Sequence, residues 1–118
     1  MRYLLLIYSN ENDDQNASEA QQAQVMEEYN KFTADSTASG AFLAGEALQP
    51  TTTATTVKVR DGKTSTMDGP FAETKEQLGG YYLVNAKDLN DAIQWAARIP
   101  GAKWGSIEVR PIWEFPAQ

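Results

Sequence analysis

The sequence predicts a mixed α+β fold, in which two amphipathic helices pack against a sheet. Three observations indicate this class. Strand-like runs of Leu, Ile, Val and Tyr alternate with segments of helical periodicity, and an Asp-Gly pair separates two of the strand-like runs. In addition, 42% of the 118 residues are hydrophobic, which is enough for one core. We therefore expect a single domain over residues 1–118.

The first half of the chain is expected to hold a strand, a long helix and a second strand. Arg2–Ser9 is rich in Leu, Ile and Tyr, as is typical of a strand inside a sheet. Ser18, with Gln three residues later, has the spacing of a capping box, and Gly40 is a typical helix stop. These signals predict a helix from about Ala17 to Ala38. Ala41–Leu48 follows as a short strand.

The middle of the chain is expected to form a hairpin and then a central strand. Asp61-Gly62 is a pair favoured in type I′ turns, because both central positions need a positive φ. The pair predicts a hairpin of Thr55–Arg60 and Lys63–Met67. Gly80–Asn85 contains two Tyr followed by Leu and Val, which favours a central strand.

The last third is expected to add a helix and a closing strand. Asp88 is a good N-cap for an amphipathic helix that ends at Pro100, and Ser106–Trp113 alternates apolar with polar residues. The resulting order, β-α-β-β-β-β-α-β, is the split β-α-β pattern of a ferredoxin-like fold with an inserted hairpin. Two helices cover only one face of such a sheet, so the other face stays apolar and exposed unless something covers it. We therefore expect a homodimer.

The composition excludes several classes of chemistry. The chain has no Cys and no His, which removes thiolate and imidazole nucleophiles, Cys- or His-ligated zinc and His-ligated haem, so we expect no cofactor and no tightly bound transition metal. A net charge of −6 argues against nucleic acid as a partner. The apolar start leads into acidic residues and is too short to span a membrane, so we expect no signal peptide, no membrane partner and a cytoplasmic location.

The segment from Met67 to Gly80 is long for a connection between strands and is densely polar. It contains the motif DGPF, followed by AETKEQLGG. This motif resembles the signature of the DGPF branch of the YCII-related proteins. The resemblance extends over nearly the whole chain and includes GEALQP at 45–50 and VKVRDG at 57–62.

The resemblance implies a dimeric α+β barrel, in which two ferredoxin-like subunits place their open sheet faces together. Founding YCII-type members carry a His and Asp pair suspected of acid–base catalysis. By a rough match those positions hold Met26 and Ala38 here, so this chemistry is not carried over. Proteins that resemble this one often occur beside extracytoplasmic-function sigma factors, which is an association of genes.

We expect a cleft between the DGPF segment and the strand around Glu46. Glu46 shares its alternation with Phe42 and Ala44, so its carboxylate is expected to point toward the core. A lysine beside a buried carboxylate would hold the pKa of that carboxyl down and prepare it to bind or to act as a base. The candidate catalytic residues are Asp68, Glu46 and Lys75. The candidate binding residues are Asp68, Gly69, Pro70, Phe71, Lys75 and Glu76.

Each assignment has a structural alternative. Asp68-Gly69-Pro70 is also typical of a tight turn, and Arg110 on the last strand would pair with Glu46 in a purely structural arrangement. Three functions therefore stay open. The chain is a small-molecule binder or enzyme that uses carboxylates, or an interaction module that contacts a sigma factor through Phe71, or a structural dimer without a ligand.

Overall fold

The structure is a computed structural model and describes residues 1–116. Its main sheet is antiparallel, with the strand order β2-β5-β1-β6. The four strands are β1 (Arg2–Ser9), β2 (Phe42–Ala47), β5 (Gln77–Asn85) and β6 (Ser106–Pro111). This order, with a helix after β1 and another after β5, is consistent with the predicted ferredoxin-like α+β fold.

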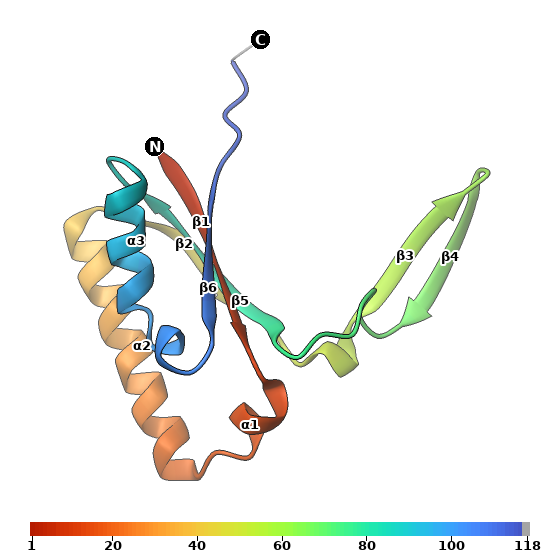
Figure 1. Ribbon diagram of the computed structural model, residues 1–118, viewed down its shortest axis with the longest axis horizontal. Helices are drawn as coiled ribbons and strands as arrows, with labels where there is room; N and C mark the ends of the chain where they lie inside the picture. Colours follow the sequence, from red (N-terminus) through yellow and green to blue (C-terminus); the bar gives the residue numbers. More distant parts are fainter. Residues whose placement is uncertain (117–118) are drawn as a thin grey trace.

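Three α-helices lie within residues 1–116, and two of them cover one side of the sheet (Figure 1). These two are α2 (Glu19–Ser39) and α3 (Leu89–Arg98), and both lie close to their predicted bounds. The third, α1 (Glu11–Gln15), was not predicted, because its sequence ENDDQ has no apolar periodicity. No helix of the described chain is both long and apolar enough to cross a membrane.

Helix α2 has the ends that its sequence predicts. Ser18 Oγ accepts a hydrogen bond from the Gln21 amide at 3.1 Å, and Gln21 Oε1 accepts one from the Ser18 amide at 3.0 Å. Gly40 ends the helix in the left-handed conformation, with φ 84°. These caps give α2 its length, and in Figure 1 its N-terminal half reaches past the region that α3 covers.

The core lies between the main sheet and the two long helices. Leu5 of β1 and Val84 of β5 are fully buried on the helical side of the sheet. Phe32 of α2 is 3% exposed, and its ring centre lies 4.7 Å from that of Tyr82 and 6.0 Å from that of Trp95. This packing fixes α2 and α3 against the strands.

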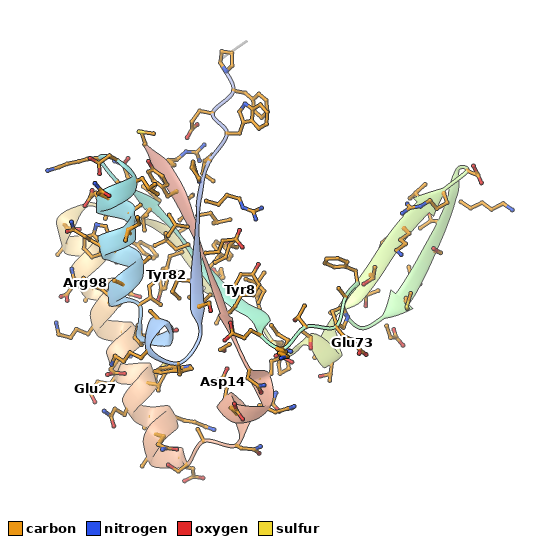
Figure 2. The ribbon with its side chains drawn as sticks, in the orientation of Figure 1. Tyr8, Asp14, Glu27, Glu73, Tyr82 and Arg98 are labelled. Atoms are coloured by element: carbon orange, nitrogen blue, oxygen red, sulfur yellow. The ribbon has the colours of Figure 1, made fainter. Side chains whose placement is uncertain are left out.

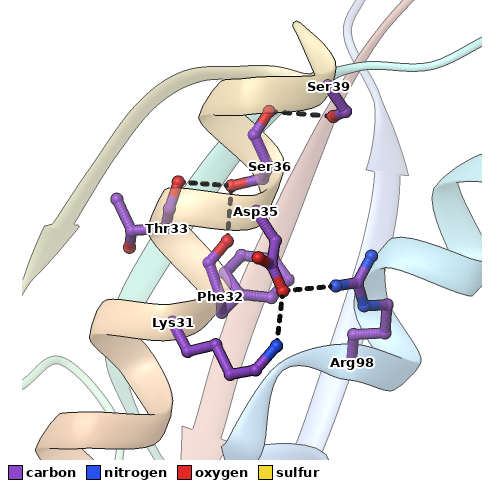
Figure 3. A network of polar contacts seen from close by, with 7 residues as sticks. All are labelled: Lys31, Phe32, Thr33, Asp35, Ser36, Ser39 and Arg98. Carbon is purple, nitrogen blue, oxygen red and sulfur yellow. Dashed lines mark hydrogen bonds and ion pairs between the residues drawn. The ribbon is translucent and has the colours of Figure 1, made fainter.

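Polar contacts join α2 to α3 at the surface. Asp35 Oδ2 accepts hydrogen bonds from Lys31 Nζ at 2.9 Å and from Arg98 at 2.8 Å (Figure 3). The Lys31 hydrogen bond is the main cause that holds the pKa of Asp35 below its ordinary value, and Arg98 adds to it. The Arg98 guanidinium also lies 4.7 Å from the centre of the Trp95 ring. Because these charges stay in contact with water, their contribution to stability is small.

The predicted hairpin is confirmed as a two-stranded ribbon of β3 (Thr55–Arg60) and β4 (Lys63–Asp68). Asp61 and Gly62 at its turn have φ values of 53° and 74°, as the Asp-Gly pair predicts. The ribbon is not part of the main sheet, and Figure 1 shows it standing away from the sheet on the side opposite the helices. The radius of gyration is therefore 16.4 Å, against about 13.5 Å for a compact domain of this length.

Two predicted boundaries are wrong. Strand β5 begins at Gln77 rather than Gly80, because Gln77 and Leu78 pair with the end of β1. The connection between β4 and β5 is therefore residues 69–76, shorter than expected. Strand β6 ends at Pro111 rather than Trp113, and its last backbone hydrogen bond to β1 runs from the Ile112 amide to the Arg2 carbonyl at 3.0 Å.

The sheet has an open face, which we define as the face without helices. Leu4, Leu6 and Tyr8 of β1 point to this face, because Leu5 and its alternate neighbours point to the helices. Register places Tyr81 opposite Leu6 and Leu83 opposite Leu4, so β5 extends the apolar surface. None of the helices within residues 1–116 covers these side chains.

Candidate functional site

A cavity of about 950 Å³ lies on the helical side of the sheet, in the region past α3; we call it the α2 cleft. Its walls are α1, much of α2, and adjoining parts of β1, β2 and β5. The wall residues that matter for its chemistry are Ser9, Asp14, Tyr29, Thr33, Glu46 and Tyr82. The volume lies within the range of roughly 300 to 1,000 Å³ that is typical of pockets for small organic molecules.

Two tyrosine hydroxyls lie in the wall of the α2 cleft. Tyr29 OH accepts a hydrogen bond from the Gly101 amide at 3.2 Å, and Tyr82 OH lies 3.3 Å from Thr33 Oγ1. Burial raises the pKa of Tyr29 to about 12, so its phenol stays protonated at neutral pH. The cleft therefore presents aromatic surface together with hydroxyl groups that are able to donate hydrogen bonds.

Side-chain contacts tie helix α1 to two other parts of the chain. Ser9 Oγ donates a hydrogen bond to Asp14 Oδ2, which joins α1 to the end of β1. The Glu11 carboxylate accepts hydrogen bonds from the Thr51 amide at 2.6 Å and from Thr51 Oγ1 at 2.8 Å. These contacts hold α1 against the segment that follows β2, so the floor of the cleft is built from residues far apart in sequence.

The lining of the α2 cleft is acidic. The residues that line it include Glu11, Asp13, Asp14 and Glu28, and also Glu46, whose side chain the register of β2 turns toward the open face. The described lining includes one cation, Lys103, whose Nζ donates to Glu28 Oε1 at 2.9 Å. Lys103 thus neutralises one carboxylate only. The excess of negative charge favours a ligand that is cationic or neutral and rich in hydrogen-bond donors.

Glu46 is exposed, and the expectation that its carboxylate points toward the core is wrong. A bulge between Phe42 and Ala44 shifts the alternation of β2 by one residue. Gly45 instead follows Phe42 on the helical face, where the Tyr82 ring packs so closely that a Cβ at position 45 would lie 2.6 Å from it. Glu46 is a residue of the edge strand β2 and still contributes to the lining of the cleft.

The DGPF motif lies at the foot of the ribbon. Asp68 ends β4 and is exposed, and Gly69 has a φ of 98°. The Gly69 amide donates to the Ala54 carbonyl at 2.7 Å, and the Gly69 carbonyl accepts from Thr56 Oγ1 at 2.9 Å. These two bonds tie Gly69 to the start of β3 and its positive φ explains the glycine, whereas no described hydrogen bond involves the Asp68 carboxylate, so the roles of Asp68 and Pro70 stay predictions.

The rest of the connection contacts the body through few groups. Asn10 Nδ2 donates to the Lys75 carbonyl at 3.3 Å, and Ser106 Oγ donates to Glu76 Oε1 at 2.8 Å. Phe71 is 86% exposed, so in a single copy its ring does not wall the cleft that was expected between the DGPF segment and the strand around Glu46. Figure 2 shows Glu73 beside the foot of the ribbon, far from Arg98 on α3.

The structure does not join Glu46, Asp68 and Lys75. Within residues 1–116, no hydrogen bond or ion pair links any two of these side chains, and the lining of the α2 cleft includes Glu46 but none of residues 68–76. Arg110 pairs with Glu108 rather than with Glu46. Their roles as catalytic or binding residues stay predictions.

Three residues of the cleft wall were not predicted as site residues from the sequence: Asp14, Tyr29 and Thr33. A signal was present, since Val25, Tyr29 and Thr33 recur at every fourth residue and therefore share one face of α2. That spacing does not distinguish a face that lines a cleft from one that lines a core.

Across residues 1–116 there is no cluster of three or more acidic side chains placed to hold a metal ion.

Comparison with known proteins gives two matches. The family model described as "YCII-related domain" matches residues 1–116. An uncharacterised protein of Rhizobium meliloti (strain 1021) is 37% identical over 114 residues, which cover 95% of this chain and 92% of that protein. Both matches span nearly the whole chain, and neither description names an activity.

Proposed function

This chain belongs to the family of YCII-related domains, and we propose that it is a homodimer that binds a small organic molecule in the α2 cleft. The observation that carries the proposal is the cleft itself, which has a volume of about 950 Å³ and a lining that includes Tyr29, Tyr82 and Asp14. Aromatic surface provides contact area, and a few fixed polar groups set the orientation of a ligand.

The ligand that fits this lining carries a positive charge or several hydrogen-bond donors. The described carboxylates of the cleft outnumber its ammonium groups, and Lys103 already pairs with Glu28. An organic anion would meet an uncompensated negative field. A primary amine would find an acceptor in the Asp14 carboxylate and an aromatic ring in the partly buried Tyr29.

The homodimer is supported by the surface of a single copy. The chain of 13.0 kDa exposes 8610 Å², whereas a compact monomer of this mass exposes roughly 6,300 Å². The open face also leaves Leu4, Leu6 and Leu83 without a covering element in the described chain. A second copy that covers these side chains would remove apolar surface from water, as the DGPF resemblance implies.

An enzymatic role for Glu46, Asp68 and Lys75 requires the dimer. In one copy these residues do not meet, so they would act together only if a second copy brings its connection 69–76 to the α2 cleft. The test is Asp68→Asn. Unchanged ligand affinity in this variant would show that Asp68 does not belong to the site, without contradicting binding in the α2 cleft.

The binding proposal is tested with a panel of primary amines, neutral amides and carboxylic acids in thermal unfolding. We expect amines to raise the unfolding temperature, since a ligand at 100 times its Kd stabilises a protein by about 2.7 kcal/mol. Asp14→Asn should weaken the effect, and Glu27→Gln, which removes an equal charge on α2 outside the lining of the cleft, should not (Figure 2). Stabilisation by carboxylic acids alone would contradict the ligand class, and no stabilisation by any compound would count against the cleft.

A second candidate function is protein recognition by the connection 69–76. The observation that favours it is the 86% exposure of Phe71, because a large apolar ring in water is typical of a contact surface. The partner expected from the resemblance is an extracytoplasmic-function sigma factor. Purified sigma factor from the same organism should bind the wild-type chain and lose affinity for Phe71→Ala, whereas equal binding of both proteins would remove this candidate.

A further inference from the structure

We infer that the β3–β4 ribbon is a dimerisation arm, whose β-branched face packs on a second copy of this chain. The inference rests on the proposed homodimer and adds a contact surface beyond the open face of the sheet. It concerns residues 55–68, which belong to neither the main sheet nor the core.

The ribbon lacks the support that its strands need. A lone two-stranded hairpin is marginally stable in water and needs a third strand or a packed face. Strands β3 and β4 pair only with each other, and Val57 and Val59 are 59% and 56% exposed. Nothing in the described chain covers these apolar side chains, which is the pattern of an element that another molecule covers.

The two faces of the ribbon differ in chemistry. Register and alternation place five β-branched side chains and one carboxylate on one face, which holds Thr55, Val57, Val59, Thr64, Thr66 and, at its foot, Asp68. The opposite face holds three cations at its outer end, together with Ser65, Thr56 and Met67. A sheet with one face on a core and the other in water has this pattern. The valine face is therefore the one that packs.

The position of the ribbon identifies a second copy as the partner. The ribbon projects on the same side of the sheet as the open face, so a copy that covers the open face lies beside the ribbon (Figure 1). The chain exposes roughly 2,300 Å² more than a compact monomer of its mass. The ribbon contributes to this excess, since five of the six residues of β3 and all six of β4 are exposed.

Charge favours the same partner. Residues 55–68 carry three cations and two acids, a net +1, which leaves −7 for the rest of a chain of net charge −6. The three cations lie on the face opposite Val57 and Val59, so this charge draws the ribbon of one copy toward the acidic body of another but does not form the contact of the valine face.

The test compares Val59→Asp with Ser65→Asp, which add the same charge on opposite faces of the ribbon. Because both side chains are exposed in one copy, neither variant should fail to fold. Sedimentation equilibrium should show a dimer dissociation constant raised at least about 100-fold for Val59→Asp and changed less than about threefold for Ser65→Asp. Equal dissociation constants for the two variants would show that the valine face does not contact a second copy.

A third variant separates the arm from the proposed homodimer. Leu6→Asp places a charge on the open face, and its dissociation constant should also rise. If Leu6→Asp disrupts the dimer and Val59→Asp does not, the proposed homodimer is correct but the ribbon is not its dimerisation arm. If the wild-type chain is monomeric at micromolar concentration, both are wrong.

Labelling gives an independent readout, because the chain has no cysteine. An environment-sensitive fluorophore on Val59→Cys should shift to the blue as concentration drives dimerisation. The same fluorophore on Ser65→Cys should not shift. A shift at neither position, in a chain that dimerises, would show that the valine face stays in water and would overturn the arm.

Discussion

Local sequence specifies two regions of the molecule equally well: the body, residues 1–54 and 77–116, and the ribbon region, residues 55–76. Packing against a common core, however, supports only the body. The capping box of α2 and the Asp-Gly turn of the ribbon both form as predicted. In the body, each strand and each long helix contributes side chains to a common core, as Leu5 and Phe32 do, whereas the ribbon region contributes none. Local signals therefore decide that an element forms, and burial decides whether its loss unfolds the rest.

The largest expected effect comes from the same substitution in the two regions. Phe32→Ala should lower the free energy of unfolding by about 3 to 5 kcal/mol, because the ring is buried against Tyr82 and Trp95. Phe71→Ala should lower it by less than about 0.5 kcal/mol, since the ring is 86% exposed. Urea unfolding of the dilute protein measures both values. A loss above about 2 kcal/mol for Phe71→Ala, which is roughly the size expected for a buried ring, would show that the ribbon region is packed as the body is.

A smaller effect is expected from alkaline pH, and it reports on the body. Burial raises the pKa of Tyr29 from 10.0 to about 12. Between these values the unfolded chain loses the phenolic proton while the folded chain keeps it, so the stability linked to Tyr29 is full below pH 10.0 and falls as the pH rises toward 12. After allowance for the partial exposure of the ring, the loss is about 1 to 2 kcal/mol.

Urea unfolding across that pH range checks the effect of Tyr29, with Tyr29→Phe as the control. The variant has no phenolic proton, so its stability should depend less steeply on pH than that of the wild type. Residues 55–76 contain no tyrosine, so the difference between the two proteins reports on the body alone. Identical slopes for the variant and the wild type would show that Tyr29 is not buried in solution.

The sequence predicted the parts of the fold that depend on neighbouring residues. Ser18 and Gly40 bound α2, and Asp61-Gly62 forms the turn of the ribbon, because caps and tight turns are satisfied within a few residues. Helix α1 escaped prediction because its sequence has no apolar periodicity, although Asn10 caps it locally; the contact of Glu11 with Thr51 adds a bond between residues distant in sequence.

The candidate site was predicted less well, for two physical reasons. Strict alternation placed Glu46 in the core, but one bulged residue in β2 moved it to the other face. An apolar ring was expected to be buried, but Phe71 lies in a region that has no core of its own. Asp14 and Tyr29, which do share a cleft, come from separate helices whose packing is not readable from spacing.

The smallest expected effect distinguishes two glycines that have nearly the same conformation. Gly40 ends α2 with φ 84°, and Gly62 turns the ribbon with φ 74°, and a Cβ added at either position would have no atom within 4 Å. Alanine at each site therefore adds backbone strain alone, of about 1 kcal/mol. Gly40→Ala should lower the free energy of global unfolding by that amount, because α2 is part of the core.

Gly62→Ala should change the free energy of global unfolding of the dilute protein by less than about 0.3 kcal/mol, because the ribbon opens without the body. Its strain should appear only in β3 and β4, whose amides should exchange with solvent roughly fivefold faster, while those of β5 keep the wild-type rate. Urea unfolding and hydrogen exchange measure the two quantities separately. If both variants lose the same free energy of unfolding, the ribbon and the body unfold as one unit, and the ribbon is supported by contacts within its own chain rather than by a second copy.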